Sequence, residues 1–251
     1  LEFDVCSSDL AACYGLIAYQ TAYLKAYYPA AFMAALMTSD YDDTDRLSIE
    51  ISECKKMGIQ VLPPDVNESF GEFAVVPGEG ELTGRENIRF GMNAVKNVGS
   101  GAVEEILRAR DTGKFATLDD FVGAVNTRLV NRKAIESLAK AGAFDGFHER
   151  TLILHNIDVI LAYGQRLQKE RSSGQTDLFG GLIDEVANSK PVLHLRPPEA
   201  RPSPRELLTW ERELMGLYLS QQPLESFVTV LEEQTIPIAS IKTAHDGKQV
   251  V

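Results

Sequence analysis

The 251-residue chain has few of the residues that build covalent or metal frameworks. It holds three cysteines, Cys6, Cys13 and Cys54, an odd number without a CxxC pair. Neither a disulfide framework nor a cysteine-based zinc site is expected from this set. The four histidines are scattered without a metal-ligand spacing. We therefore predict no metal site in the chain, and the reducing cytoplasm is the expected compartment.

Long apolar runs and an excess of positive charge are also missing. The longest apolar stretches, such as residues 10–18, are well below the roughly 20 residues of a membrane-spanning helix, so a soluble protein with no membrane partner is expected. Acidic residues outnumber basic ones by 36 to 25, which excludes a uniformly basic nucleic-acid coat. Neither a GxSxG nucleophile motif nor a phosphate loop ending in GlyLysSer/Thr is present.

What the chain does contain is helical periodicity over most of its length. Residues 11–25 and 30–37 carry apolar side chains at helical spacing, with Pro29 between them, and predict two helices broken at the proline. The pattern returns at Val103 and again over residues 131–140. With 44% hydrophobic residues the chain can bury a core, so disorder throughout is excluded.

Helix start and stop signals locate two more helices. Thr44 is expected to cap a helix that ends at Gly58, with the neighbouring acidic cluster supplying N-terminal charge and not metal ligands. Ser203, Pro204 and Glu206 fit the N-cap, N1 and N3 positions of a capping box, and Gly216 is the stop. The acidic cluster is Asp40, Asp42, Asp43 and Asp45.

Strand and linker signals complete the fold class. The Pro63–Pro64 pair predicts an extended path, and residues 73–91 predict a small β-hairpin. Five of the fourteen residues in 191–204 are proline, which is typical of a semi-rigid linker. The last fifteen residues, 237–251, resemble the opening of a β-domain. The expected fold is mainly α with a small β-hairpin.

The first candidate site is the turn over residues 95–103, VKNVGSGAV. Small residues between two helices let the backbone approach a phosphate, and the N–H groups at the start of the second helix face the anion. Residues 85–140 hold ten basic and seven acidic side chains, whereas the rest of the chain is strongly acidic. The alternative is an ordinary helix-connecting turn. The predicted DNA-binding residues are Lys96, Asn97, Val98, Gly99, Ser100, Gly101, Arg108, Arg132 and Lys133.

A second candidate lies in a polar stretch before GlyGly. Gln175, Asp177, Leu178 and Phe179 belong to the sequence QTDLF, in which two large apolar side chains are adjacent. Burying them on a partner would contribute roughly 1.5 to 3 kcal/mol each. The residues alone leave two interpretations open, since the pair either anchors the chain to a partner or packs against its own domain.

Several long motifs, in order from about residue 11 to the end, resemble the bacterial replicative DNA polymerase III α subunit family. They are CYGLIAYQTAYLK (13–25), PAAFMAALM (29–37), MGIQVLPPDVN (57–67), RFGMNAVKNVG (89–99), KAGAFD (140–145), GQTDLFG (174–180) and ERELMGLYL (211–219).

The resemblance implies a helical fingers segment, a helix-hairpin-helix module that holds duplex DNA, a linker with a sliding-clamp motif, and the first strands of an incomplete OB domain. Gly99 and Gly101 fall on the hairpin, and Gln175, Asp177, Leu178 and Phe179 on the clamp motif. The implied divisions are 11–72 for the distal fingers, 73–150 for the hairpin module, 151–202 for a helix and the linker, 203–236 for a helical connector and 237–251 for the OB start.

The chain departs from the family pattern in two places. Asn97 stands where the family hairpin usually has glycine, and asparagine tolerates left-handed backbone geometry. Before Cys13 the family has a polar segment with lysine and histidine, whereas Ser8 and Leu10 stand here. Residues 1–10 are therefore expected to be a non-native leader.

The expected function is part of a replicative polymerase that binds duplex DNA and the sliding clamp and, through the full-length protein, other replicase subunits. The family's catalytic aspartates lie in a palm domain N-terminal to this segment. The chain alone is thus expected to be inactive and without a cofactor, while Mg²⁺ belongs to the parent polymerase. The alternatives are a non-catalytic interaction scaffold and a fragment of the related error-prone polymerase.

Overall fold

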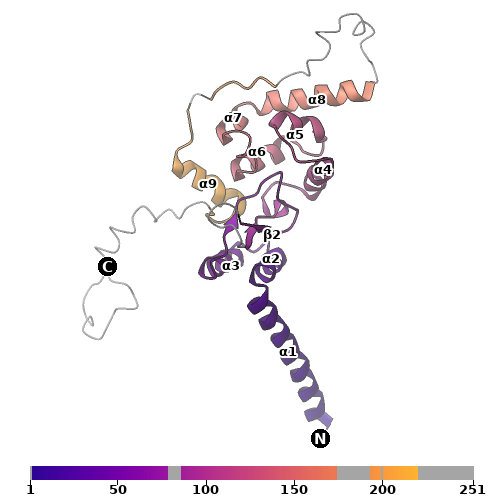
Figure 1. Ribbon diagram of the computed structural model, residues 1–251, viewed down its shortest axis with the longest axis vertical. Helices are drawn as coiled ribbons and strands as arrows, with labels where there is room; N and C mark the ends of the chain where they lie inside the picture. The colour runs from indigo at the N-terminus through magenta and orange to yellow at the C-terminus, as the bar shows by residue number, and fades with distance from the viewer. Residues whose placement is uncertain (1, 79–85, 174–192, 199, 220–251) are drawn as a thin grey trace, which may run out of the picture.

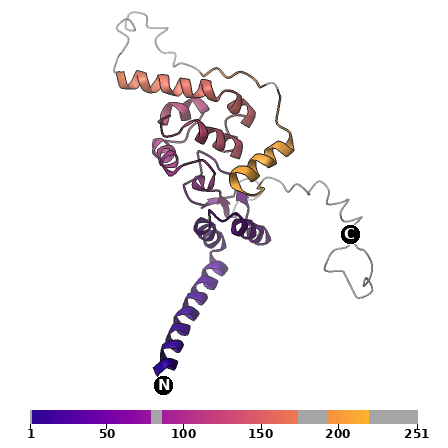
Figure 2. The ribbon, with the colours of Figure 1, turned by 180° about the vertical axis from the view of Figure 1, so that it is seen from behind.

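The computed structural model describes residues 2–78, 86–173, 193–198 and 200–219. The chain is mainly helical, as the sequence predicted, and it contains one small three-stranded sheet (Figure 1). Helix α8 (Ile157–Ser173) lies at one end of the molecule and helix α1 (Glu2–Tyr27) at the other, in both views (Figures 1 and 2). Within the described residues, no helix combines the length and the hydropathy that crossing a membrane requires.

The N-terminal helices break where the proline predicts. Helix α2 (Pro29–Ser39) follows α1 after Tyr28, and Pro29 occupies its first turn, where its missing N–H has no intrahelical acceptor to lose. Helix α1 begins at Glu2, earlier than the expected start at residue 11. Residues 2–14 contain neither glycine nor proline, so nothing in them stops the helix. Only the C-terminal end of α1 approaches the rest of the protein (Figure 1).

The cap of the next helix is one residue earlier than predicted. Helix α3 (Thr44–Lys56) is capped by Asp43, whose carboxylate accepts from the N–H groups of Asp45 at 3.2 Å and Arg46 at 3.1 Å. The prediction that Thr44 caps this helix is wrong, because Thr44 is already the first helical residue. Gly58 ends the helix with φ of +75°, as expected.

The predicted hairpin is part of a three-stranded sheet in the order β1-β3-β2. Strand β2 (Ala74–Pro77) pairs antiparallel with β3 (Glu86–Arg89), and β1 (Val61–Leu62) pairs parallel with β3 on the other side. Strand β1 was not predicted. It supplies only two residues ahead of Pro63, too few for a recognisable pattern.

The core continues from the sheet into a group of helices. These are a single 3-10 turn, η2 (Met92–Ala94), followed by α4 (Ser100–Arg110), α5 (Leu118–Ala124), α6 (Arg132–Ala141), α7 (Arg150–His155) and α8. Phe121 lies at its centre, with its ring edge-on to Phe115 and Phe144 at centroid distances of 5.2 and 5.0 Å. These aromatic contacts join α5 to the segment that follows α6.

The Pro-rich linker is bound to the helices where it is described. Asn156 exchanges two 2.8 Å hydrogen bonds with the backbone of Arg196, and Leu193 donates its N–H to Asp119. Helix α9 (Pro204–Met215) then begins with the predicted capping box of Ser203 and Glu206 and ends at Gly216, which has φ of +80°. The expected OB start, 237–251, lies outside the described residues.

Candidate nucleic-acid interface

The predicted hairpin turn joins η2 to α4 and depends on a left-handed residue. Asn97 has φ of +68° and is the one non-glycine residue with positive φ in the described part of the chain. Its side-chain amide donates to Ser137 Oγ of α6 at 3.4 Å. The prediction that asparagine accommodates left-handed geometry at this position is therefore confirmed.

Two further contacts hold the turn against α9 and the hydrophobic core. The backbone N–H of Lys96 donates to the carbonyl of Leu214, at the C-terminal end of α9, at 2.9 Å. Val98 is one of the predicted DNA-binding residues, but its side chain is buried in the core. It anchors the turn and presents no side chain to a ligand. The turn is thus fixed by α6, α9 and the core together.

The first turn of α4 is open to the outside. Gly99 is its N-cap and provides no side-chain cap, while Gly99, Ser100 and Gly101 are all exposed. Among the described residues, no acceptor pairs with the N–H of Ser100 or Gly101, as expected for the first N–H groups of a helix. A Cβ placed on Gly99 or Gly101 would meet no atom within 4 Å. The backbone at this helix N-terminus is accessible to an anion.

In the second hairpin, formed by α5 and α6, the N-terminus of the second helix is capped by a side chain. Asn131 is the N-cap of α6, and its side chain accepts from the N–H of Ala134 at 3.0 Å. One of the donors that an anion would use is therefore already satisfied. Of the two hairpins, the first offers more free backbone donors.

The predicted basic side chains differ in their surroundings. Lys96 and Lys133 are exposed, and neither forms an ion pair within the described residues. Arg132 pairs with Asp158 of α8, and both side chains are largely exposed, so the pair costs little to exchange for a phosphate. Arg110 is used structurally, because it donates to the carbonyls of Val66 and Ser69 and lies over the ring of Phe70.

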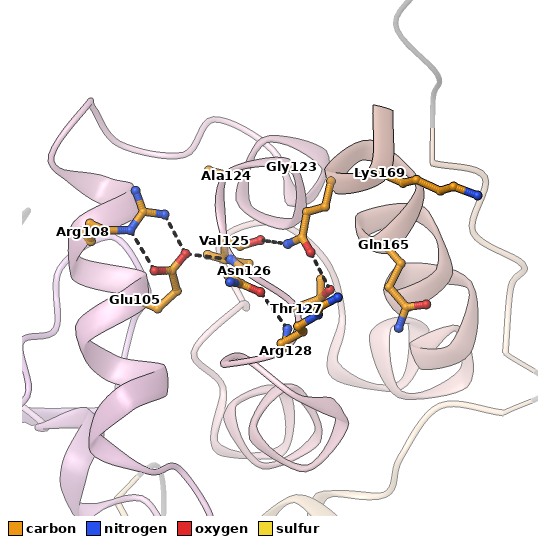
Figure 3. A pocket seen from close by; sticks show the side chains of 11 residues that line it. Glu105, Arg108, Gly123, Ala124, Val125, Asn126, Thr127, Arg128, Gln165 and Lys169 are labelled. Atoms are coloured by element: carbon orange, nitrogen blue, oxygen red, sulfur yellow. Dashed lines mark hydrogen bonds and ion pairs between the residues drawn. The ribbon is translucent and has the colours of Figure 1, made fainter. Parts of the chain in front are cut away.

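Arg108 forms part of a bridge that the sequence did not reveal. It binds the buried carboxylate of Glu105 through Nε at 2.8 Å and Nη2 at 2.6 Å, and this guanidinium holds the pKa of Glu105 below its ordinary value. The same carboxylate accepts from the backbone N–H of Asn126 at 2.7 Å (Figure 3). The i, i+3 spacing of Glu105 and Arg108 indicates an ion pair on one helix. The hydrogen bond from Asn126 could not be predicted in this way, because Asn126 lies in another part of the chain.

This bridge borders a polar groove of about 750 Å³ between α4, the α5–α6 loop and α8 (Figure 3). From α8, Gln168 donates to the carbonyl of Val125 at 2.8 Å and accepts from Thr127 Oγ1 at 3.2 Å. Sequence reasoning missed this groove, because its walls come from three segments far apart in the chain. The second predicted site, Gln175, Asp177, Leu178 and Phe179, lies outside the described residues.

Comparisons with known proteins agree with this geometry. Residues 58–152 match a family model described as a helix-hairpin-helix motif, which covers both hairpins. Two proteins named DNA polymerase III subunit alpha are similar to most of the chain. The one from Saccharopolyspora erythraea is 42% identical and the one from Campylobacter jejuni is 38% identical, each over 86% of the present chain. The corresponding protein of Thermus aquaticus is 38% identical over 85% of the chain.

The match covers only part of each relative. It spans 18% of the Saccharopolyspora and Campylobacter proteins and 16% of the Thermus protein. The chain is therefore homologous to a segment of bacterial DNA polymerase III subunit alpha, and this segment contains a helix-hairpin-helix motif.

Proposed function

We propose that the chain binds duplex DNA through the first hairpin, with the N–H groups of Ser100 and Gly101 and the side chain of Lys96 on the phosphate backbone. The observation that carries this proposal is the uncapped and exposed first turn of α4, where neither glycine has an atom near its missing side chain. Arg132 and Lys133 at the start of α6 supply further positive charge. Contacts of this kind carry no base preference.

The experiment adds side chains where the backbone is proposed to approach DNA. Gly99→Ala and Gly101→Ala together leave the fold intact, since each new Cβ projects into open space. Within α4, alanine at position 101 is expected to add up to about 1 kcal/mol of stability. Duplex affinity at 0.1 M salt is expected to fall by about eightfold for each phosphate that the added methyl groups keep away from the backbone.

The matched control is Gly15→Ala in α1, another glycine with no atom within 4 Å of its missing Cβ. Fluorescence anisotropy with a labelled duplex, over a series of salt concentrations, measures affinity for the wild type and both variants. Equal affinities for the wild type and the double variant would contradict the proposal. The hairpin would then serve packing only, and the interaction-scaffold alternative would take its place.

We also propose that Gln175, Asp177, Leu178 and Phe179 bind a sliding clamp as a linear peptide. The support is the adjacency of two large apolar side chains in a polar stretch together with the homology to polymerase III subunit alpha. Leu178→Ala with Phe179→Ala should remove roughly 3 to 5 kcal/mol of binding free energy, enough to abolish a micromolar contact. Titration of the clamp with both forms of the chain tests this.

We infer that the longer parent protein is the replicative polymerase and carries the nucleotidyl transfer chemistry. The relatives from Saccharopolyspora and Campylobacter both bear the name DNA polymerase III subunit alpha, which favours this parent over the error-prone enzyme. The Mg²⁺ expected for that chemistry has no fitting site in the described part of this chain, because no three His, Cys, Asp or Glu residues there are arranged to hold a metal ion. Other replicase subunits would bind through the parent protein.

A further inference from the structure

We propose that the nucleic-acid interface extends onto α8, and that the groove between α4, the α5–α6 loop and α8 holds a second stretch of the phosphate backbone of the same duplex. This inference rests on the proposed function, because it assumes that the chain binds DNA at the first hairpin. It goes beyond the matched motif, since residues 58–152 end before α8 begins at Ile157.

The charge of the groove fits a polyanion. Arg108, Arg128 and Lys169 line it, and Glu105 is the single acidic residue among the residues that line it. The negative charge of Glu105 is matched by Arg108 through two hydrogen bonds. Arg128 and Lys169 are both exposed, and the basic side chains outnumber the one acidic side chain among the residues that line the groove.

Arg108 retains binding capacity despite its ion pair. An arginine side chain has five N–H donors, and Glu105 takes one from Nε and one from Nη2. The side chain is 64% exposed, so the remaining donors are accessible to a ligand. A guanidinium held in place by one carboxylate presents these donors to a phosphate in a fixed direction.

The loop at the floor of the groove is fixed from both sides. Glu105 of α4 accepts from the N–H of Asn126, and Gln168 of α8 binds both Val125 and Thr127. Six consecutive residues, 123–128, line the groove, from the end of α5 into this fixed loop. A loop that is already ordered adds no ordering cost when a ligand binds, so its contacts contribute fully to affinity.

The distance between the two sites suits one duplex. Ser100 and Arg108 lie on the same helix, eight residues apart, which corresponds to about 12 Å along the axis of α4. One turn of B-DNA is about 34 Å long, so the hairpin and the groove both fall within a single turn. Simultaneous contact adds phosphates to the interface without requiring the DNA to bend sharply.

The test removes charge from the groove and leaves the first hairpin unchanged. In the full chain, Arg128→Gln with Lys169→Gln is expected to lower the slope of log affinity against log salt by up to about 1.8, which is 0.9 for each phosphate contact. Duplex affinity at 0.1 M salt should fall by about 10- to 60-fold. Urea denaturation confirms that the variant folds as the wild type does.

The matched control is Lys55→Gln with Lys56→Gln, which removes the same charge from exposed positions on α3. It should retain wild-type affinity within about twofold, as expected if long-range net charge contributes little at this salt. An equal loss in this control would overturn the inference, because the effect would then come from net charge.

Two further outcomes separate this inference from the proposed function. Wild-type binding by the Arg128→Gln, Lys169→Gln variant, combined with weak binding by the Gly99→Ala, Gly101→Ala variant, would overturn the groove and leave the hairpin proposal standing. A wild-type chain that does not bind duplex DNA at all would overturn both.

Discussion

Asn97 provides a direct test of how the hairpin keeps its shape. With φ of +68°, it occupies a backbone region that costs an ordinary L-residue roughly 1 to 2 kcal/mol, and a β-branched residue more. Asn97→Val should therefore destabilise the chain by about 2 to 3 kcal/mol, since it also removes the 3.4 Å hydrogen bond to Ser137. Asn97→Gly removes the backbone strain at positive φ, and this gain offsets two losses, the long hydrogen bond and the larger conformational entropy of glycine in the unfolded chain. The free energy of unfolding should therefore change by less than about 1 kcal/mol.

Urea denaturation of the full chain measures these differences as shifts in the midpoint. Lys96→Val is the matched control, because Lys96 is exposed in the same turn and does not have positive φ. It should cost less than about 0.5 kcal/mol. The reasoning fails if both valine variants lose the same stability, or if Asn97→Gly is as damaging as Asn97→Val.

Three other predictions address different parts of the chain. Burial raises the pKa of the Glu50 carboxyl to about 7 in the folded chain, against 4.5 when unfolded. The folded state is therefore not penalised for burying this group below pH 4.5, where the carboxyl is protonated, and it loses stability as pH rises through 7. Glu50→Gln should therefore stabilise the chain at pH 8 and not at pH 4.5, as urea midpoints at the two pH values will report. Gly91→Ala should destabilise by more than about 2 kcal/mol in thermal or urea unfolding, because its Cβ would stand 2.7 Å from the backbone of Glu72 and Gly71. The purified chain should extend no primer with Mg²⁺, and extension that survives further purification would contradict the assignment of chemistry to the rest of the parent protein.

Local signals predicted the parts of the fold that local interactions determine. The glycine-rich turn, the left-handed Asn97 and the capping box of Ser203 and Glu206 each depend on residues within a few positions of one another. The sequence accordingly located the hairpin and the start of α9. The cap of α3 was misplaced by one residue because Asp43 and Thr44 are both good cap residues, and only the backbone geometry decides between them.

Contacts between distant segments were not predictable in this way. Strand β1 exists because Val61 pairs with Ile88, and two residues alone carry no strand pattern. The groove depends on the hydrogen bonds between Glu105 and Asn126 and between Gln168 and Val125. Neither hydrogen bond corresponds to a recognisable pattern in the local sequence. The proposed contribution of α8 to DNA binding therefore comes from tertiary structure and not from a motif.

The contact between the hairpin and α9 also sets an order of events during synthesis. Leu214, whose carbonyl accepts from the N–H of Lys96, follows Lys96 by 118 residues. At roughly 5 to 20 residues per second, a ribosome needs about 6 to 24 s to make this stretch. Throughout that interval the nascent chain has its helix-hairpin-helix sequence but lacks the acceptor that holds the turn. The turn proposed to bind DNA is therefore completed late, after α9 has left the ribosome, and the proposed nucleic-acid site is fully formed only when most of this segment has been translated.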